Sequence, residues 1–171
     1  MGYMIGLVVV VVLLGIAAAL LKKGKPGQSA STTLSGTMPF KKNKYFLSAA
    51  EQSFYGVLKQ AVAGQLDIFA KVRLLDVLWL PPQVQGKQRH KNLVQSKHVD
   101  FVLCDSKALV PMLVIELDDV SHARSDRERR DLLVDKVLTD AKLPVLRVPA
   151  KASYDVRQLA ADIRQALGAN R

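Results

Sequence analysis

Acidic residues lie within or at the end of two apolar segments in the middle of the chain. Asp100 lies inside the segment 97–104 (KHVDFVLC), where an unpaired buried carboxylate would be costly. Glu116 and Asp118 follow at the end of the next apolar segment, 109–117. If both segments are strands of a hairpin, the three carboxylates converge at one end of it. Like charges that close are unfavourable without a cation, and an oxygen-rich cluster suits Mg²⁺ or Mn²⁺.

The elements before this hairpin are a helix and a strand. Ser48 is a good N-cap with Glu51 at the capping-box position, and apolar residues recur at helical spacing to about Ala63. Gly64 is expected to stop this helix. Residues 67–75 (DIFAKVRLL) are rich in apolar residues and predict a strand. The polar, Gln-rich residues 81–92 predict a loop, with or without a short helix.

The hairpin and the elements after it complete an α/β pattern. The segment 109–117 is apolar almost throughout, as expected of a central strand buried on both faces. A helix over 126–141, a strand over 145–148 and a helix over 154–167 follow. The first of these helices is predicted to turn four apolar residues inward: Leu132, Leu133, Val137 and Leu138. The predicted order is α-β-β-β-α-β-α.

The N-terminal part differs in composition from the rest. Residues 4–21 are 18 apolar residues without charge, enough for a helix to span a hydrocarbon core of about 30 Å. The first positive charges follow this run, which favours an uncleaved anchor over a signal peptide, with the following domain in the cytoplasm. We therefore predict a transmembrane anchor over 1–21, a flexible basic linker over 22–44 and a folded domain over 45–169.

The positive charge is concentrated next to the predicted anchor. The formal net charge is +10, but six lysines and no acid lie in 22–44, which leaves about +4 for the remainder. These lysines suit anionic lipid head groups or nucleic acid, and a stop-transfer flank is the simpler interpretation. The single cysteine, Cys104, excludes an intramolecular disulfide and a Cys-based zinc cluster, and we expect no disulfide-linked partner.

Several segments together resemble a known group of proteins. LSAAEQSFYGVL, KHVDFVLCD, LVIELDDVSH, RRDLLVDKVL and PVLRV are similar to the bacterial domain-of-unknown-function family numbered 2726. The order of elements and acids resembles the PD-(D/E)XK restriction-endonuclease-like superfamily, with a pattern similar to very-short-patch repair endonucleases. The resemblance covers roughly residues 40–167. It implies a restriction-endonuclease-like α-β-β-β-α-β core, with a mixed sheet flanked by helices, and nucleic acid as the partner.

The resemblance also implies roles for individual residues. Asp100 and Glu116 would be the metal-binding carboxylates, with Asp118 as a further ligand and Glu51 as the extra acid that some members use. Asp118 stands where the motif has Lys, so another cation would have to act. The resemblance suggests Lys97 or Lys136 as the replacement cation. It suggests His122 as an acid/base and Arg147 as a phosphate contact. A metal-activated water would then attack a phosphodiester of DNA or RNA.

Each of these residues also has a simpler explanation. Glu51 is partly explained by capping, Asp118 by a strand entering solvent, and His122 by a hydrogen bond within its loop. Lys97 and Lys136 suit solvated surfaces, and Asp131 and Asp135 suit ion pairs with Arg127 and Arg130 on their own helix. The missing motif Lys and the modest charge of the domain keep a second function open. In that alternative the chain is an inactive nuclease-fold module that binds nucleic acid or a protein at the membrane.

Overall fold

The structure is a computed structural model that describes residues 37–118 and 125–168. The chain divides into two compact units, one up to Lys42 and one from Asn43 onward. The predicted anchor over 1–21 and most of the linker lie outside the described residues. Within the described ranges, no helix combines the length and the apolar character needed to cross a membrane. All the described helices and strands belong to the second unit.

The first helix, α2 (Ala49–Val62), forms as its N-terminal sequence predicts. The Ser48 hydroxyl accepts a hydrogen bond from the Glu51 backbone N–H at 3.2 Å, and the Glu51 carboxylate accepts one from the Ser48 N–H at 2.7 Å. This reciprocal pair satisfies two backbone donors that the helix leaves open. The helix ends at Ala63, which is left-handed with φ 48°, and Gly64 follows with φ 74°.

Four strands form one mixed sheet in the order β1-β2-β3-β4. The strands are β1 (Leu66–Arg73), β2 (His98–Asp105), β3 (Pro111–Asp118) and β4 (Val145–Pro149). β1 pairs with β2 and β2 with β3 in antiparallel fashion, whereas β4 runs parallel to β3. The predicted hairpin is therefore confirmed, and the mixed α/β class with it.

The predicted strand over 67–75 was too long at its C-terminal end. The exposed and covered residues of β1 alternate only to Arg73, and a short helix, α3 (Leu74–Val77), follows. Leu74 and Leu75 are consecutive apolar residues that both pack into the same core. A strand would direct them to opposite faces, whereas a helical turn lets both reach that core.

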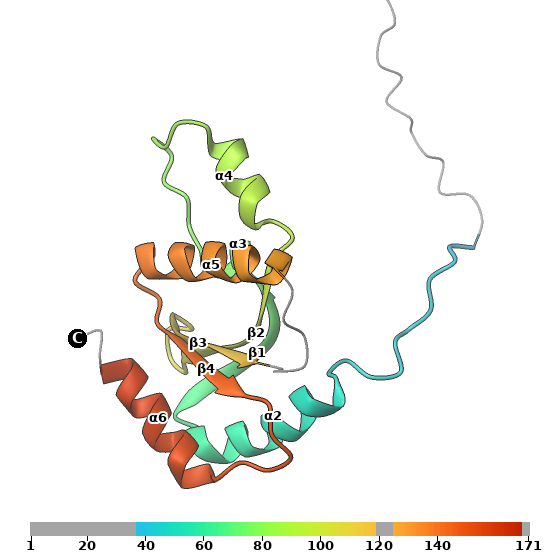
Figure 1. The fold of residues 1–171 in the computed structure, drawn as a ribbon, viewed down its shortest axis with the longest axis vertical. Coiled ribbons are helices and arrows are strands. Elements are labelled where there is room, and N and C mark those ends of the chain that lie inside the picture. Colours follow the sequence, from blue (N-terminus) through green and yellow to red (C-terminus); the bar gives the residue numbers. More distant parts are fainter. Residues whose placement is uncertain (1–36, 119–124, 169–171) are drawn as a thin grey trace, which may run out of the picture. The chain divides into compact units, whose positions relative to one another are not determined.

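The remaining helices follow the sheet connections. Part of the polar segment after α3 forms α4 (Lys87–Val94), so the alternative with a short helix is the correct one. α5 (Ser125–Asp140) connects β3 to β4, and α6 (Val156–Gly168) ends the domain. Figure 1 shows α2 and α6 on one side of the sheet and α5 on the other.

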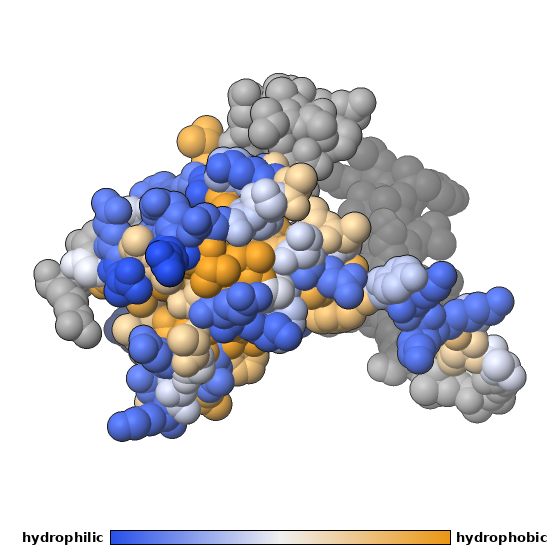
Figure 2. Space-filling view, turned by 90° about the horizontal axis from the view of Figure 1, so that it is seen from below, coloured by the Kyte–Doolittle hydropathy of each residue, from blue (hydrophilic) through white to orange (hydrophobic). Residues whose placement is uncertain are grey.

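Two apolar cores hold these layers together. One joins α2 and α6 to the sheet, with Phe54, Leu58, Phe101, Ile115 and Leu159 among its residues. The other lies on the α5 side of the sheet and includes Leu74, Val102, Val114, Val134 and Leu138. Seen from the side of α2 and α6, hydrophilic residues surround a central apolar area (Figure 2).

The predicted central position of β3 is confirmed, but the prediction that Leu132 of α5 faces the core was wrong. Leu113, Val114 and Ile115 have no exposed surface, and they pack into both cores. Leu132 is 68% exposed, whereas Val134 and Leu138 are buried. Residues 134 and 138 lie one turn apart on the face toward the sheet, and residue 132 is about 200° around the helix from Val134.

These two leucines of α5 provide a matched test of the packing. Leu138→Ala is expected to lower the free energy of unfolding by about 2–5 kcal/mol, because it leaves a cavity against the sheet. Leu132→Ala removes the same atoms from an exposed site and should change it by less than about 0.5 kcal/mol. Urea unfolding of the fragment 43–171 measures both. Equal losses in the two variants would contradict the assignment of the α5 face.

Candidate functional site

One register position of the sheet carries a charged residue on every strand. Glu116 of β3 pairs with Arg147 of β4. The β2–β3 ladder ends at the pair Phe101 and Ile115, and its continuation sets Asp100 opposite Glu116. On the other side, Lys71 and Asp100 lie between the β1–β2 pairs Ala70–Phe101 and Val72–Val99, where the pairing is interrupted. We call these four residues the charged row: Lys71, Asp100, Glu116 and Arg147.

The Asp100 carboxylate is fixed by the backbone of the neighbouring strand. Its Oδ2 atom accepts a hydrogen bond from the Leu117 N–H of β3 at 2.8 Å, in a partly buried position. The Asp100 side chain thus accepts a hydrogen bond from the β3 backbone just beyond Phe101–Ile115, the last residue pair of the β2–β3 ladder. The bond directs the carboxylate toward β3 and limits its freedom to turn away from Glu116.

The surroundings of Glu116 disfavour the charged form of its carboxyl group. Burial, the charge of Asp100 and a hydrogen bond with the Asp100 side chain raise the pKa of Glu116 to about 8, although the Arg147 charge opposes this. Two neighbouring carboxyl groups cannot both ionise at low cost in free energy without a cation. A proton relieves the repulsion at neutral pH, and a metal ion could replace that proton.

On the β1 side, the row connects to the first helix. Lys71 Nζ lies 2.7 Å from Glu51 Oε1, and the Glu51 side chain is only 12% exposed. Burial raises the pKa of Glu51, but hydrogen bonds from Lys71 and Ser48 outweigh it and leave the pKa below its usual value. Lys71 itself is left-handed, with φ 53°, which is uncommon for a residue other than glycine. Glu51 therefore both caps α2 and holds Lys71.

On the β4 side, Arg147 joins the end of β3 to α5. Its Nη1 atom lies 3.1 Å from Asp118 Oδ1, and its Nη2 atom lies 2.6 Å from Asp135 Oδ1. The Arg147 guanidinium group thus holds Asp118 at the end of β3. It also connects Asp135 of α5 to the sheet. The expected partners of Asp135, Arg127 and Arg130, have no described side chains.

The structure brings together some of the predicted site residues. Asp100 and Glu116 are neighbours, while Asp118 and Glu51 are each engaged by a basic residue at the edges of the charged row. Within the described residues, no three His, Cys, Asp or Glu side chains gather in a group that could hold a metal ion. The metal site therefore stays a prediction, centred on two carboxylates.

One of the two predicted replacement cations, Lys136, is engaged by another acid. Lys136 pairs with Asp140 at 2.9 Å on the exposed face of α5, with 74% of its side chain exposed. Lys97 precedes β2, three residues before Asp100. His122 lies outside the described residues. Cys104 is buried in the core, as expected.

Lys71 is the residue that the sequence interpretation missed. It was part of a segment interpreted only as an apolar strand, and its place beside β2 depends on the β1–β2 register. The available signal was a lysine within DIFAKVRLL, two residues before an arginine. That signal is weak, because alternate residues of a strand commonly face solvent.

The fold and this site define a mixed α/β domain with an acidic pair across its two middle strands. The chain belongs to the family described as Protein of unknown function (DUF2726), whose model matches residues 43–167. No curated protein and no solved structure matches the chain. The matched range begins with the second compact unit and ends within α6.

The raised pKa of Glu116 predicts a pH-dependent loss of stability. The native state keeps this proton up to about pH 8, whereas an unperturbed glutamic acid loses it near 4.5. The native state therefore binds more protons within that window, and stability falls as the pH rises through it. Glu116→Gln removes this titration. Its free energy of unfolding relative to wild type should rise between pH 5 and 8 by roughly 2 kcal/mol, after allowance for partial solvation.

Urea unfolding of the fragment 43–171 in EDTA at several pH values measures this difference. Asp140→Asn is the matched control, because it neutralises an exposed acid on α5. A difference between Glu116→Gln and wild type that stays constant from pH 5 to 8 would contradict the raised pKa of Glu116.

Proposed function

We propose that the chain is a metal-dependent nuclease with a restriction-endonuclease-like core, tethered to the bacterial inner membrane through residues 1–21 with its domain in the cytoplasm. The order of elements supports this proposal, since one helix precedes three antiparallel strands and a crossover helix leads to a parallel fourth strand. The observation that carries it is the pair of carboxylates, Asp100 and Glu116, on the two middle strands.

The charges around this pair favour a cation as the missing component. The network that links the charged row to its neighbours contains five carboxylates and two basic groups. The carboxylates are Glu51, Asp100, Glu116, Asp118 and Asp135. With Glu116 protonated at neutral pH, four of these carboxylates are charged against two basic groups. A divalent ion at Asp100 and Glu116 would balance the negative charge of the network.

The donor set fits Mg²⁺ or Mn²⁺. Carboxylate oxygens are the ligands that these hard ions prefer, and Mg²⁺ commonly takes only one or two carboxylates and keeps several waters. Asp100 and Glu116 would hold the ion. Asp118 and Glu51 would contribute only if their basic partners release them. Bound there, the ion would lower the pKa of a water molecule and polarise a phosphodiester oxygen.

Other residues of the charged row would act on the phosphate. Lys71 lies at the register position next to Asp100 and is held by Glu51, so in this proposal it supplies the cation that the motif lacks at position 118. Arg147 neighbours Glu116 and would contact a phosphate oxygen through its guanidinium group. Both groups would stabilise negative charge that develops on the phosphate during attack.

One observation favours the alternative of an inactive nuclease-fold module. Asp118, which replaces the motif Lys, is engaged by Arg147, and Lys71 is engaged by Glu51. Both basic groups are thus paired with acids of the chain itself. In this alternative the network is structural, and the domain binds nucleic acid or a protein at the membrane without cleavage.

The two functions separate in a nuclease assay. The full chain in neutral detergent is incubated with single-stranded and duplex DNA and RNA, in Mg²⁺, Mn²⁺ or EDTA. We expect cleavage that EDTA abolishes. Asp100→Asn and Glu116→Gln should each lower it by at least about 100-fold, the upper range for disturbing an outer-shell partner of a metal ligand. Asp140→Asn should leave it unchanged.

Lys71 gives a further test within the same assay. Lys71→Asn removes the charge while keeping a residue type that tolerates the left-handed conformation. Cleavage should fall while metal binding persists, which distinguishes Lys71 from the two ligands. Full cleavage by Lys71→Asn would overturn its role, and the absence of cleavage from the wild type with every substrate would favour the inactive module.

A further inference from the structure

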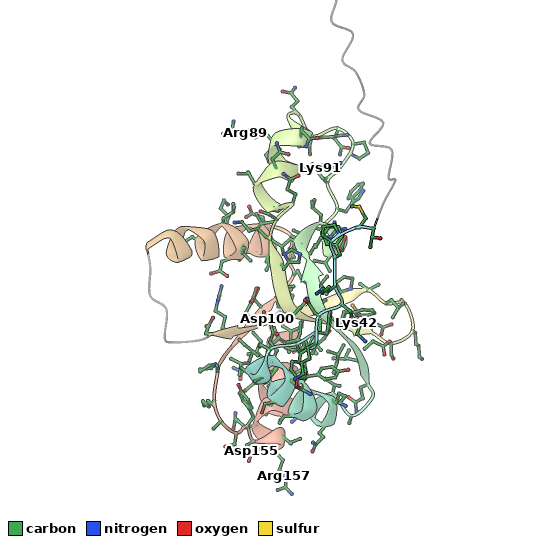
Figure 3. The ribbon with its side chains drawn as sticks, turned by 90° about the vertical axis from the view of Figure 1, so that its right-hand side faces the viewer. Lys42, Arg89, Lys91, Asp100, Asp155 and Arg157 are labelled. Carbon is green, nitrogen blue, oxygen red and sulfur yellow. The ribbon has the colours of Figure 1, made fainter. Side chains whose placement is uncertain are left out.

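The connection between β1 and β2 is a basic segment that projects from the domain. We call residues 78–97, which include α4, the basic arm. Its basic residues are Lys87, Arg89, Lys91 and Lys97, with His90 among them, and the chain has no acid between Asp76 and Asp100. Figure 1 shows α4 projecting beyond α5, and Figure 3 shows Arg89 and Lys91 on α4, far from Arg157 of α6.

The positive charges of the arm are not neutralised within the described part of the chain. Arg89, His90 and Lys91 are exposed, and the ion pairs of the described residues include none of the arm's basic groups. Lys87 and Lys91 are four residues apart and therefore share one face of α4, where like charges repel. An anionic partner along this face would remove the repulsion.

The arm also carries the only tryptophan of the chain. Trp79 is 78% exposed, although most large aromatic side chains gain by burial. An exposed aromatic ring on the same segment as these basic residues offers a stacking surface to a nucleic-acid base. Val94 is buried in the core on the α5 side and anchors the C-terminal end of α4. The arm is thus attached to the core while its charges face outward.

The arm leaves the sheet at the end that bears the charged row. Lys71 is two residues from the end of β1, and Asp100 is two residues from the start of β2. Lys97, the last residue of the arm, is three residues from Asp100, or about 10 Å along an extended chain. A strand of nucleic acid with a phosphate at the charged row would have its neighbouring phosphates within reach of the arm.

We propose that the basic arm binds the phosphate backbone of single-stranded nucleic acid, with a base stacked on Trp79. The inference rests on the proposed function, since it extends the substrate from the charged row along α4. The sequence of α4 (KQRHKNLV) argues against a lipid surface. Its two apolar residues are Leu93 and the buried Val94, so α4 has no apolar face to insert into a membrane.

The test compares two triple variants of the full chain in neutral detergent and EDTA. One variant is Lys87→Gln, Arg89→Gln and Lys91→Gln, which neutralises α4. The control is Lys151→Gln, Arg157→Gln and Arg164→Gln, which removes the same charge from exposed residues in or near α6. Fluorescence anisotropy with a labelled 20-nucleotide single strand measures the affinity over a range of salt concentrations. The control also accounts for binding by the lysines before residue 45, which both variants keep.

The arm variant should bind about tenfold or more weakly near 0.1 M salt. The slope of log K against log salt should be shallower by about 2, because each phosphate contact in a single strand contributes about 0.7. The control should change affinity by less than about threefold. Equal losses in both variants, or no loss in the arm variant, would overturn the proposal.

Trp79 provides a second, independent measurement on the wild type. Stacking of a base should quench its fluorescence when the oligonucleotide is added, and Trp79→Ala should bind about tenfold more weakly. Vesicles of phosphatidylcholine and phosphatidylserine serve as the membrane comparison. An emission shift with these vesicles, without quenching by the oligonucleotide, would identify a lipid surface and overturn the proposal. All binding is measured without metal, so a chain that binds through the arm and cleaves nothing would overturn only the proposed activity.

Discussion

The repulsion between Asp100 and Glu116 is the constraint on which the rest of the site depends. Two carboxylates at adjacent positions of neighbouring strands cost free energy, and burial together with the charge of Asp100 raises the pKa of Glu116 to about 8. The fold tolerates the pair because other contacts hold it. The Leu117 N–H binds Asp100, and the Arg147 charge partly offsets that of Glu116. A structure selected for stability alone has no need of such a pair, which is why we propose a function for it.

The two faces of the sheet position this pair in different ways. On one face, Phe54 and Leu58 of α2 share a core with Phe101 and Ile115, the residues adjacent to Asp100 and Glu116 on their strands. That packing fixes the ends of β2 and β3. On the other face, Val134 and Leu138 pack α5 against the sheet, and Asp135 reaches Arg147. The ion pairs Glu51–Lys71 and Asp118–Arg147 flank the acidic pair, one on each side.

The sequence predicted those features that depend on local pattern. The α2 cap, the hairpin and the buried centre of β3 follow from capping chemistry and from continuous apolar runs. The sequence predicted three converging carboxylates at the end of this hairpin. The structure sets Asp100 and Glu116 side by side, whereas Asp118 pairs with Arg147. The position of Lys71 beside β2 was not predictable, because it arises from the pairing of two strands that are far apart in the sequence. The pairing of Arg147 with Asp118 and Asp135 joins three elements, and no local pattern indicates it.

The central claim is that Asp100 and Glu116 together take up a divalent cation. Calorimetric titration of the fragment 43–171 with Mn²⁺, in two buffers of different ionisation enthalpy, tests it most directly. We predict one bound ion, release of a proton near pH 7 as the metal displaces it from Glu116, and loss of binding in both Asp100→Asn and Glu116→Gln. Unchanged Mn²⁺ binding in Glu116→Gln, or no binding by the wild type at millimolar Mn²⁺, would contradict the account.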